Sequence, residues 1–171
     1  MVSHVDPDAA FVFSYGSNML TRRIRARTQS AISVTAGEIR GYRMAFHKRG
    51  VDGSGKANAR HTGDDDDRVH GVVFRIDAVE LVSLDAVELG YRRRPVHVIV
   101  RSGHTIEAAC YEALDEYVDP ELVPFGWYRA LVLAGAREHR LPAHHVLWVE
   151  CHPFAEDPDA ARRKVNSRLL E

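Results

Sequence analysis

The stretch FVFSYGSNML, residues 11–20, is an apolar run that ends abruptly in the polar turn Tyr15-Gly16-Ser17-Asn18. Its apolar half predicts a strand over residues 10–14, and the residues after the turn predict a short polar helix over residues 20–27. The expected order is therefore strand, tight turn and helix. Such a turn either only reverses the chain or also binds a ligand, and the rest of the sequence is needed to distinguish the two.

Further strands and loops are predicted downstream of this stretch. Alternating apolar and polar residues predict strands over residues 31–37 and 41–48, each with one face in water. The Gly- and Asp-rich residues 51–68 predict a long loop with one short extended piece at residues 57–59. A β-branched run predicts a strand over residues 69–76.

The second half of the chain adds helices and a hairpin. Asp77 and Glu80 have capping-box spacing and predict a helix that ends near Val87. Residues 95–100 and 105–113 predict a hairpin. Further helices are predicted to begin at Phe125, Leu141 and Asp159, the last of them basic, amphipathic and peripheral. Because strands and helices alternate irregularly, the predicted fold class is α+β with a curled, barrel-like sheet.

The composition is that of an ordinary globular protein. The 171 residues are 45% hydrophobic and 27% charged, which predicts a single domain over residues 1–171 with a buried core. Lys and Arg number 23 against 24 Asp and Glu, for a formal net charge of −1. A chain without excess positive charge is not expected to bind nucleic acid.

Targeting and cysteine patterns point to a cytoplasmic protein. Residues 1–10 lack the basic start and apolar core of a secretory signal, and no apolar run is long enough to span a membrane. Cys110 and Cys151 show no C-x-x-C spacing, which argues against a disulfide scaffold and a zinc site. None of the ten histidines has a metal-binding spacing, so no metal is expected.

Two motifs come close to known sites without matching them. Gly50, Gly55 and Lys56 have the spacing of a phosphate-binding loop, but Ala57 lacks the hydroxyl that would hold magnesium, so a hairpin loop is the better interpretation. Ser17 lacks the second glycine of a nucleophile elbow, which argues against a covalent serine mechanism.

Charged residues offer weaker candidates. Asp85 and Glu88 fall on one face of the predicted helix, where such a pair is usually solvated but can also share acid and base work. The arginines at residues 22–27 and 92–94 indicate solvated faces or a small anionic substrate.

Five pieces of the chain, in order, resemble the γ-glutamylcyclotransferase family. They are FSYGSNM at residues 13–19, the Gly-rich segment ending KANA at residues 50–59, VHGVVF at residues 69–74, LDAVE at residues 84–88, and Tyr91 with the strand after it. Tyr128 and the segments AGARE and Leu141-Pro142 continue the likeness, which covers residues 11–145 and leaves residues 146–171 as a helical tail. In one departure, Leu89 stands directly after the acidic residue where the family commonly has glycine.

The resemblance implies a fold, a site and a reaction. The implied fold is a small mixed-strand β-barrel flanked by helices. Glu88 is implied as the catalytic acid/base, with no cofactor, and Asp85 is assigned to structure. The implied substrate-binding residues are Tyr15, Gly16, Ser17, Asn18, Met19, Tyr91 and Tyr128. For Tyr128, core packing is an equal alternative.

The implied reaction is a cyclisation that releases 5-oxoproline. The α-amine of a γ-glutamyl compound attacks its own γ-carbonyl, so the enzyme mainly folds its substrate and moves a proton. Backbone N–H groups at Gly16, Ser17 and Asn18 are expected to bind the oxyanion or the substrate carboxylate.

Several alternatives remain open from the sequence. The chain could instead remove a γ-glutamyl group in a biosynthetic pathway or from a protein lysine, or bind a small ligand without catalysis. The leaving group, with glutathione, γ-glutamyl dipeptides, polyamine conjugates and antibiotic precursors as candidates, and the oligomeric state are not defined by the sequence.

Overall fold

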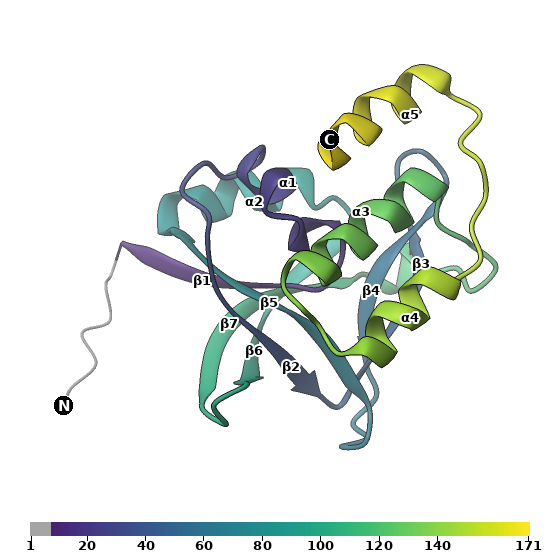
Figure 1. Cartoon of the computed structure of the whole chain (residues 1–171). Coiled ribbons are helices and arrows are strands. Elements are labelled where there is room, and N and C mark those ends of the chain that lie inside the picture. Colours follow the sequence, from purple (N-terminus) through teal and green to yellow (C-terminus); the bar gives the residue numbers. More distant parts are fainter. Residues whose placement is uncertain (1–7) are drawn as a thin grey trace.

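A closed five-stranded barrel forms the centre of the structure, a computed structural model that describes residues 8–171 (Figure 1). Neighbouring strands run antiparallel except β1 and β7, whose parallel contact at Val12 and Ala109 closes the barrel. In barrel order the strands are β1 (Ala9–Ser14), β5 (Arg68–Asp77), β2 (Ile32–Arg40), β6 (Tyr91–Val100) and β7 (Thr105–Ala113). The predicted α+β class and the mixed-strand barrel flanked by helices are confirmed. Residues 1–7, most of the stretch that lacks a secretory-signal pattern, lie outside the described part.

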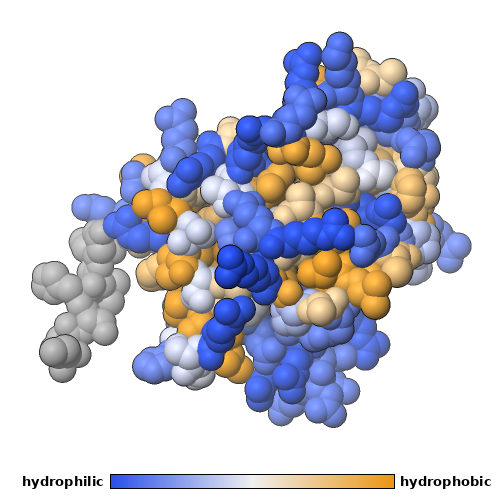
Figure 2. Space-filling view, viewed as in Figure 1, coloured by the Kyte–Doolittle hydropathy of each residue, from blue (hydrophilic) through white to orange (hydrophobic). Residues whose placement is uncertain are grey.

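Strand β5 explains where the core lies. It pairs with both β1 and β2, and its residues Val72, Val73 and Phe74 are all fully buried although successive side chains point to opposite faces. A strand covered on both faces needs a continuous apolar run, which is what the sequence supplies here. On the face shown in Figure 2, hydrophilic residues separate the apolar patches that remain exposed.

A separate two-stranded sheet corrects the predicted loop over residues 51–68. Strands β3 (Tyr42–Arg49) and β4 (Gly55–His61) pair antiparallel, and residues 50–54 form the turn between them. Strand β4 is held by contacts distant in sequence: the Asn58 side chain accepts a hydrogen bond from Ala113 N at 2.9 Å. Its residues are poor strand formers, so tertiary contacts override local preference.

In the described part of the chain, five α-helices flank the barrel. They are α1 (Thr21–Arg25), α2 (Leu81–Val87), α3 (Gly126–Glu138), α4 (Ala143–Cys151) and α5 (Ala160–Ser167), and short 3-10 turns lie at Ser17–Met19, Ala78–Glu80, Asp115–Tyr117 and Arg168–Leu170. Figure 1 shows α3 and α4 together on one flank of the barrel, with α5 beside α3. Between residues 8 and 171, no helix has the length and apolar composition needed to cross a bilayer.

Two local predictions need correction. The Asp77 side chain does not cap the following helix, and the Glu80 carboxylate instead accepts hydrogen bonds from the backbone N–H groups of Gln29 and Ser30 at 2.9 and 3.1 Å. Glu80 thus anchors the loop before β2. Strand β6 begins at Tyr91 rather than at residue 95, since Tyr91 already pairs with Ala113.

A buried histidine at the contact between α4 and β5 predicts an acid-sensitive fold. The rings of His145 and His70 lie 5.5 Å apart, and the His145 side chain is buried. Burial, with smaller contributions from His70 and His144, lowers the pKa of His145 from 6.5 to about 4. Between these pH values the unfolded chain binds a proton at His145 that the folded chain does not, so stability is present above pH 6.5 and is lost as the pH falls.

We expect the free energy of unfolding to fall between pH 6.5 and 4, with a His145 contribution on the order of 3 kcal/mol from a shift of this size. His145→Leu should remove that contribution, and His97→Leu, at an exposed histidine of β6, should keep it. Urea unfolding at several pH values measures the slopes. Equal slopes for wild type and His145→Leu would contradict the prediction.

Candidate active site

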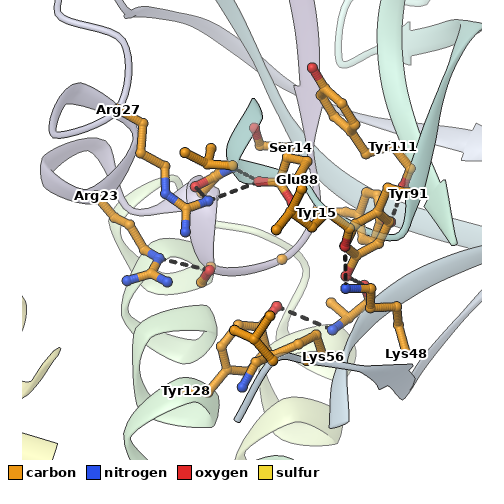
Figure 3. A pocket seen from close by; sticks show the side chains of 18 of the residues that line it. Ser14, Tyr15, Arg23, Arg27, Lys48, Lys56, Glu88, Tyr91, Tyr111 and Tyr128 are labelled. Atoms are coloured by element: carbon orange, nitrogen blue, oxygen red, sulfur yellow. Dashed lines mark hydrogen bonds and ion pairs between the residues drawn. The ribbon is translucent and has the colours of Figure 1, made fainter. Parts of the chain in front are cut away.

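A cavity of about 350 Å³ lies beside the C-terminal end of β1 and the turn that follows it (Figure 3). Its wall is built from the turn after β1, helix α1, the β3–β4 hairpin, the end of α2, β6 and α3. Of the predicted site residues, those that line it are Tyr15, Gly16, Ser17, Asn18, Glu88, Tyr91 and Tyr128. The structure thus brings together residues from three distant parts of the sequence.

Met19 lies elsewhere. It is fully buried beneath the turn and does not line the cavity. The backbone of Met19 and Leu20 packs so closely on Gly135 of α3 that a Cβ atom there would lie 2.5 Å from Leu20 N. The structure therefore assigns Met19 to the core, where it supports the turn, and corrects its predicted place in the binding site.

The turn itself is pressed between β4 and α3. At Gly16 a Cβ atom would lie 3.0 Å from Ala57 Cβ and 3.1 Å from the Tyr128 hydroxyl, so only glycine fits without a shift. The Tyr15 hydroxyl donates to the carbonyl of Tyr111 on β7. These contacts fix the backbone of the turn against the barrel.

Glu88 stands at the end of α2 with a defined orientation. Its Oε1 accepts hydrogen bonds from Asn18 Nδ2 and Arg27 Nη1, both at 2.8 Å, and its side chain is 14% exposed. Arg27 also donates to Asn18 Oδ1 at 3.0 Å, which closes a three-residue network. Within residues 8–171 no donor binds Oε2 of Glu88. One carboxylate oxygen is therefore anchored and the other is available to a ligand.

The departure at Leu89 does not redirect this side chain. Leu89 is exposed, and Gly90 takes the positive φ of 78° that the chain needs to turn into β6. Asp85, one turn before Glu88, accepts hydrogen bonds from the Tyr111 hydroxyl and Arg93 at 2.7 and 2.8 Å. It ties α2 to the barrel, in keeping with the structural role expected of it.

The hydroxyl groups of two tyrosines form hydrogen bonds with the backbone of Ala57 on β4. The Tyr91 hydroxyl donates to Ala57 O at 2.6 Å, and the Tyr128 hydroxyl accepts from Ala57 N at 3.1 Å. Burial raises the pKa of Tyr15, Tyr91 and Tyr128, so all three are neutral near pH 7. Tyr128 both packs in the core and lines the cavity, so the two alternatives are compatible.

Cationic side chains also line the cavity: Arg23 belongs to the arginine cluster interpreted from the sequence as a solvated face or a contact for a small anionic substrate, whereas Lys48 was missed. Arg23 donates to Ser17 Oγ at 2.9 Å, and burial, with Arg27, lowers its pKa to about 10, so it remains positive at pH 7. Lys48 also lines the cavity, and it lies two residues after Phe46 in the alternating pattern that buries Met44 and Phe46 on β3. A lysine at an apolar register position is a signal that could have identified it.

The segment with the spacing of a phosphate-binding loop also lines the cavity. Residues 50–54 are the β3–β4 turn, and Lys56 pairs with Asp52 at 2.8 Å. The tail, expected to be peripheral, also reaches the cavity, because Arg162 of α5 lines it while pairing with Asp157 at 2.5 Å. Trp127 donates to the same carboxylate at 2.8 Å and ties the tail to α3.

The fold and this cavity define a small barrel protein that can bind a polar molecule beside a fixed carboxylate. A family model described as gamma-glutamyl cyclotransferase, AIG2-like, matches residues 12–130, more than half of the chain. The chain therefore belongs to this family, and the resemblance noted in the sequence is confirmed.

Two individual relatives share less than 30% sequence identity with this chain. Gamma-glutamylcyclotransferases of Bos taurus and Mus musculus are 28% and 29% identical to the chain over 150 and 144 residues. These alignments cover 82% and 78% of this chain and 77% and 73% of the relatives. A solved structure of a gamma-glutamyl cyclotransferase superposes with a TM-score of 0.80 at 23% identity, covering 94% of this chain and 99% of that one. At this identity the structural match establishes the shared fold.

Proposed function

We propose that the protein is an enzyme that cyclises a γ-glutamyl compound to 5-oxoproline and releases a free amine. The observation that carries this proposal is the Glu88 carboxylate, anchored by Asn18 and Arg27 through one oxygen only, in the wall of a cavity formed by the Tyr15–Asn18 turn. Family membership supports the same reaction class.

The first step of the proposed reaction is a proton transfer to Glu88. The substrate α-amine is mostly protonated near pH 7, and Oε2 of Glu88 removes a proton so that the nitrogen lone pair can attack. A carbon–nitrogen bond forms between the α-amine and the γ-carbonyl carbon, and the carbonyl oxygen becomes an oxyanion. The nucleophile is part of the substrate, so the enzyme's main task is to hold it folded.

In the second step the original amide bond breaks. The oxyanion collapses to a carbonyl, and the departing nitrogen takes the proton held by Glu88. The ring nitrogen then gives its extra proton to the freed Glu88 carboxylate, which passes it to the departing amine, so that 5-oxoproline and an ammonium ion leave. One carboxyl group can thus serve as base and then as acid. Glu88 returns to its starting protonation state, so no further reactant is needed.

Groups on the turn side of the cavity suit the γ-glutamyl unit. Arg23, next to Ser17, has no carboxylate partner among residues 8–171 and offers a positive charge for the substrate α-carboxylate. The N–H groups of Ser17 and Asn18 start a short 3-10 turn and are candidates to donate to the oxyanion. In the proposed binding mode, the attacked carbonyl lies between the turn and Glu88.

Mass spectrometry tests the proposal directly. Incubation with γ-glutamyl dipeptides, glutathione and γ-glutamyl amines should yield 5-oxoproline and an equal amount of free amine from at least one compound. Each compound incubated without protein serves as the control for spontaneous cyclisation. No enzyme-dependent 5-oxoproline from any member of the panel would overturn the proposed function.

A further inference from the structure

Lys48 is a buried cation without an acidic partner. It is 5% exposed, and its amine donates to the carbonyl of Leu89 at 2.5 Å and lies 4.6 Å from the centre of the Tyr91 ring. Within residues 8–171 no carboxylate lies within ion-pair distance of it. Burial lowers its pKa, against the longer-range pull of Glu88 and Asp52, each of which already has its own cationic partner. A carboxylate bound beside Lys48 would offset the cost of burying its charge.

Apolar side chains surround the cavity at the same place. Val51 at the tip of the β3–β4 turn is 95% exposed, and Val87 and Leu89 at the end of α2 are 47% and 59% exposed. All three line the cavity. Single exposed apolar residues are common, but three around one opening form a patch that an apolar ligand can cover.

These features occupy the side of the cavity that the γ-glutamyl unit leaves free. Figure 3 shows Lys48 on the side away from Arg23 and Arg27, with Glu88 between them. The hydrogen bond from Lys48 to Leu89 joins the cation to the apolar patch. If the γ-glutamyl unit binds at the turn, the amine that leaves must extend past Glu88 toward Lys48.

Resting on the proposed function, we propose that the leaving group is a bulky apolar α-amino acid. Lys48 binds its carboxylate, and Val51, Val87 and Leu89 contact its side chain. The preferred substrate class is thus a γ-glutamyl dipeptide with a large apolar second residue. Lys48 and the three apolar residues determine specificity and take no part in the proton transfers.

Three probe substrates separate the two contacts. They are γ-glutamyl-phenylalanine, γ-glutamyl-glycine, which lacks the side chain, and γ-glutamyl-phenethylamine, which keeps the ring but lacks the carboxylate. For wild type we expect kcat/KM for the phenylalanine compound to exceed that of each other probe by about tenfold or more, since apolar contacts and charged hydrogen bonds each contribute factors of this size.

Variants assign each preference to its residues. Leu89→Ser and Val51→Ser should lower the phenylalanine-to-glycine ratio of kcat/KM by about 3- to 10-fold each. The matched control is Val82→Ser, at a valine of α2 that is exposed but does not line the cavity. Lys48→Met should lower the phenylalanine-to-phenethylamine ratio by about tenfold or more, and Arg49→Met, at the exposed neighbour paired with Asp119, should not.

Each ratio compares two substrates on one protein, so a partly unfolded variant does not imitate the effect. Equal kcat/KM for all three probes with wild type, or ratios unchanged in Lys48→Met and Leu89→Ser, would overturn the inference while leaving the proposed function intact. Failure of all three probes and of the wider panel to yield 5-oxoproline would overturn the proposed function and this inference with it.

Discussion

Glu88→Gln is expected to lower kcat for 5-oxoproline formation by about 100- to 10,000-fold, the usual contribution of a general acid/base. Both hydrogen bonds of the carboxylate go to Oε1. The amide oxygen of glutamine can accept the same two bonds from Asn18 and Arg27, so the network keeps its geometry. The amide nitrogen that replaces Oε2 cannot take a proton from the substrate amine. The substitution therefore removes the proposed base and leaves the cavity in place.

Steady-state kinetics and product binding together test this expectation. Calorimetry with 5-oxoproline should show that Glu88→Gln retains product binding, which separates a lost base from a collapsed site. Glu116→Gln, at an exposed glutamate that does not line the cavity, is the matched control and should keep wild-type kcat. Wild-type product yield from Glu88→Gln would refute the assigned role of Glu88.

The barrel was predictable because its strands carry their own signals. In β5 the buried run of Val72, Val73 and Phe74 reflects burial on both faces, a property visible in the sequence itself. Strand β4 has no such signal. Its Gly, Lys, Asn and Arg residues disfavour strands, and the contact that holds Asn58 comes from Ala113, 55 residues away. Local patterning does not contain that information.

The residues of the candidate site that belong to a sequence motif were predictable. The Tyr-Gly-Ser-Asn turn and Glu88 carry the family resemblance, and the structure brings them to within one hydrogen bond of each other. Arg27 appeared in the sequence only as one of several clustered arginines. Its contact with Glu88 depends on how α1 and α2 meet, which is a property of tertiary packing.

The position of Arg162 in the tail also depends on tertiary contacts that the local sequence does not reveal. Its amphipathic helix predicted a peripheral element, but Asp157 is fully buried and bonds to both Arg162 and Trp127.

Met19 is a residue for which the sequence motif is present but the contact with the cavity is not. It belongs to the recognised motif, yet its apolar side chain is directed into the core, so membership of a motif did not define contact with the cavity.

Gly135→Ala is expected to impair both stability and catalysis, although alanine is the better helix former. The added carbon would lie 2.5 Å from Leu20 N and 2.7 Å from the carbonyl carbon of Met19, both backbone atoms that must move. Overpacking of this kind costs about 1–3 kcal/mol, against about 1 kcal/mol gained in helix propensity. The net loss is up to about 2 kcal/mol, which lowers Tm by up to about 8 °C in a chain of this size.

The catalytic effect should exceed the effect on stability, because the displaced segment is the turn that carries Ser17 and Asn18. Asn18 also anchors Glu88, so a shift of the turn moves the proposed binding groups and the proposed base together. A misplacement of about 1 Å can cost about 100-fold in rate, and we expect kcat/KM to fall by a factor of that order.

Gly126→Ala in the same helix provides the matched control. Its added carbon would lie 3.0 Å from the ring of Phe154 and 3.6 Å from Glu156 Oε1, both side-chain atoms, and the Phe154 ring is exposed and free to shift. Near-wild-type Tm and kcat/KM are therefore expected for Gly126→Ala. If Gly135→Ala behaved like Gly126→Ala, close packing of α3 against the turn would not be what positions Asn18 and Glu88. Loss of activity in Gly135→Ala with most of the protein still folded would show instead that α3 sets the geometry of the site.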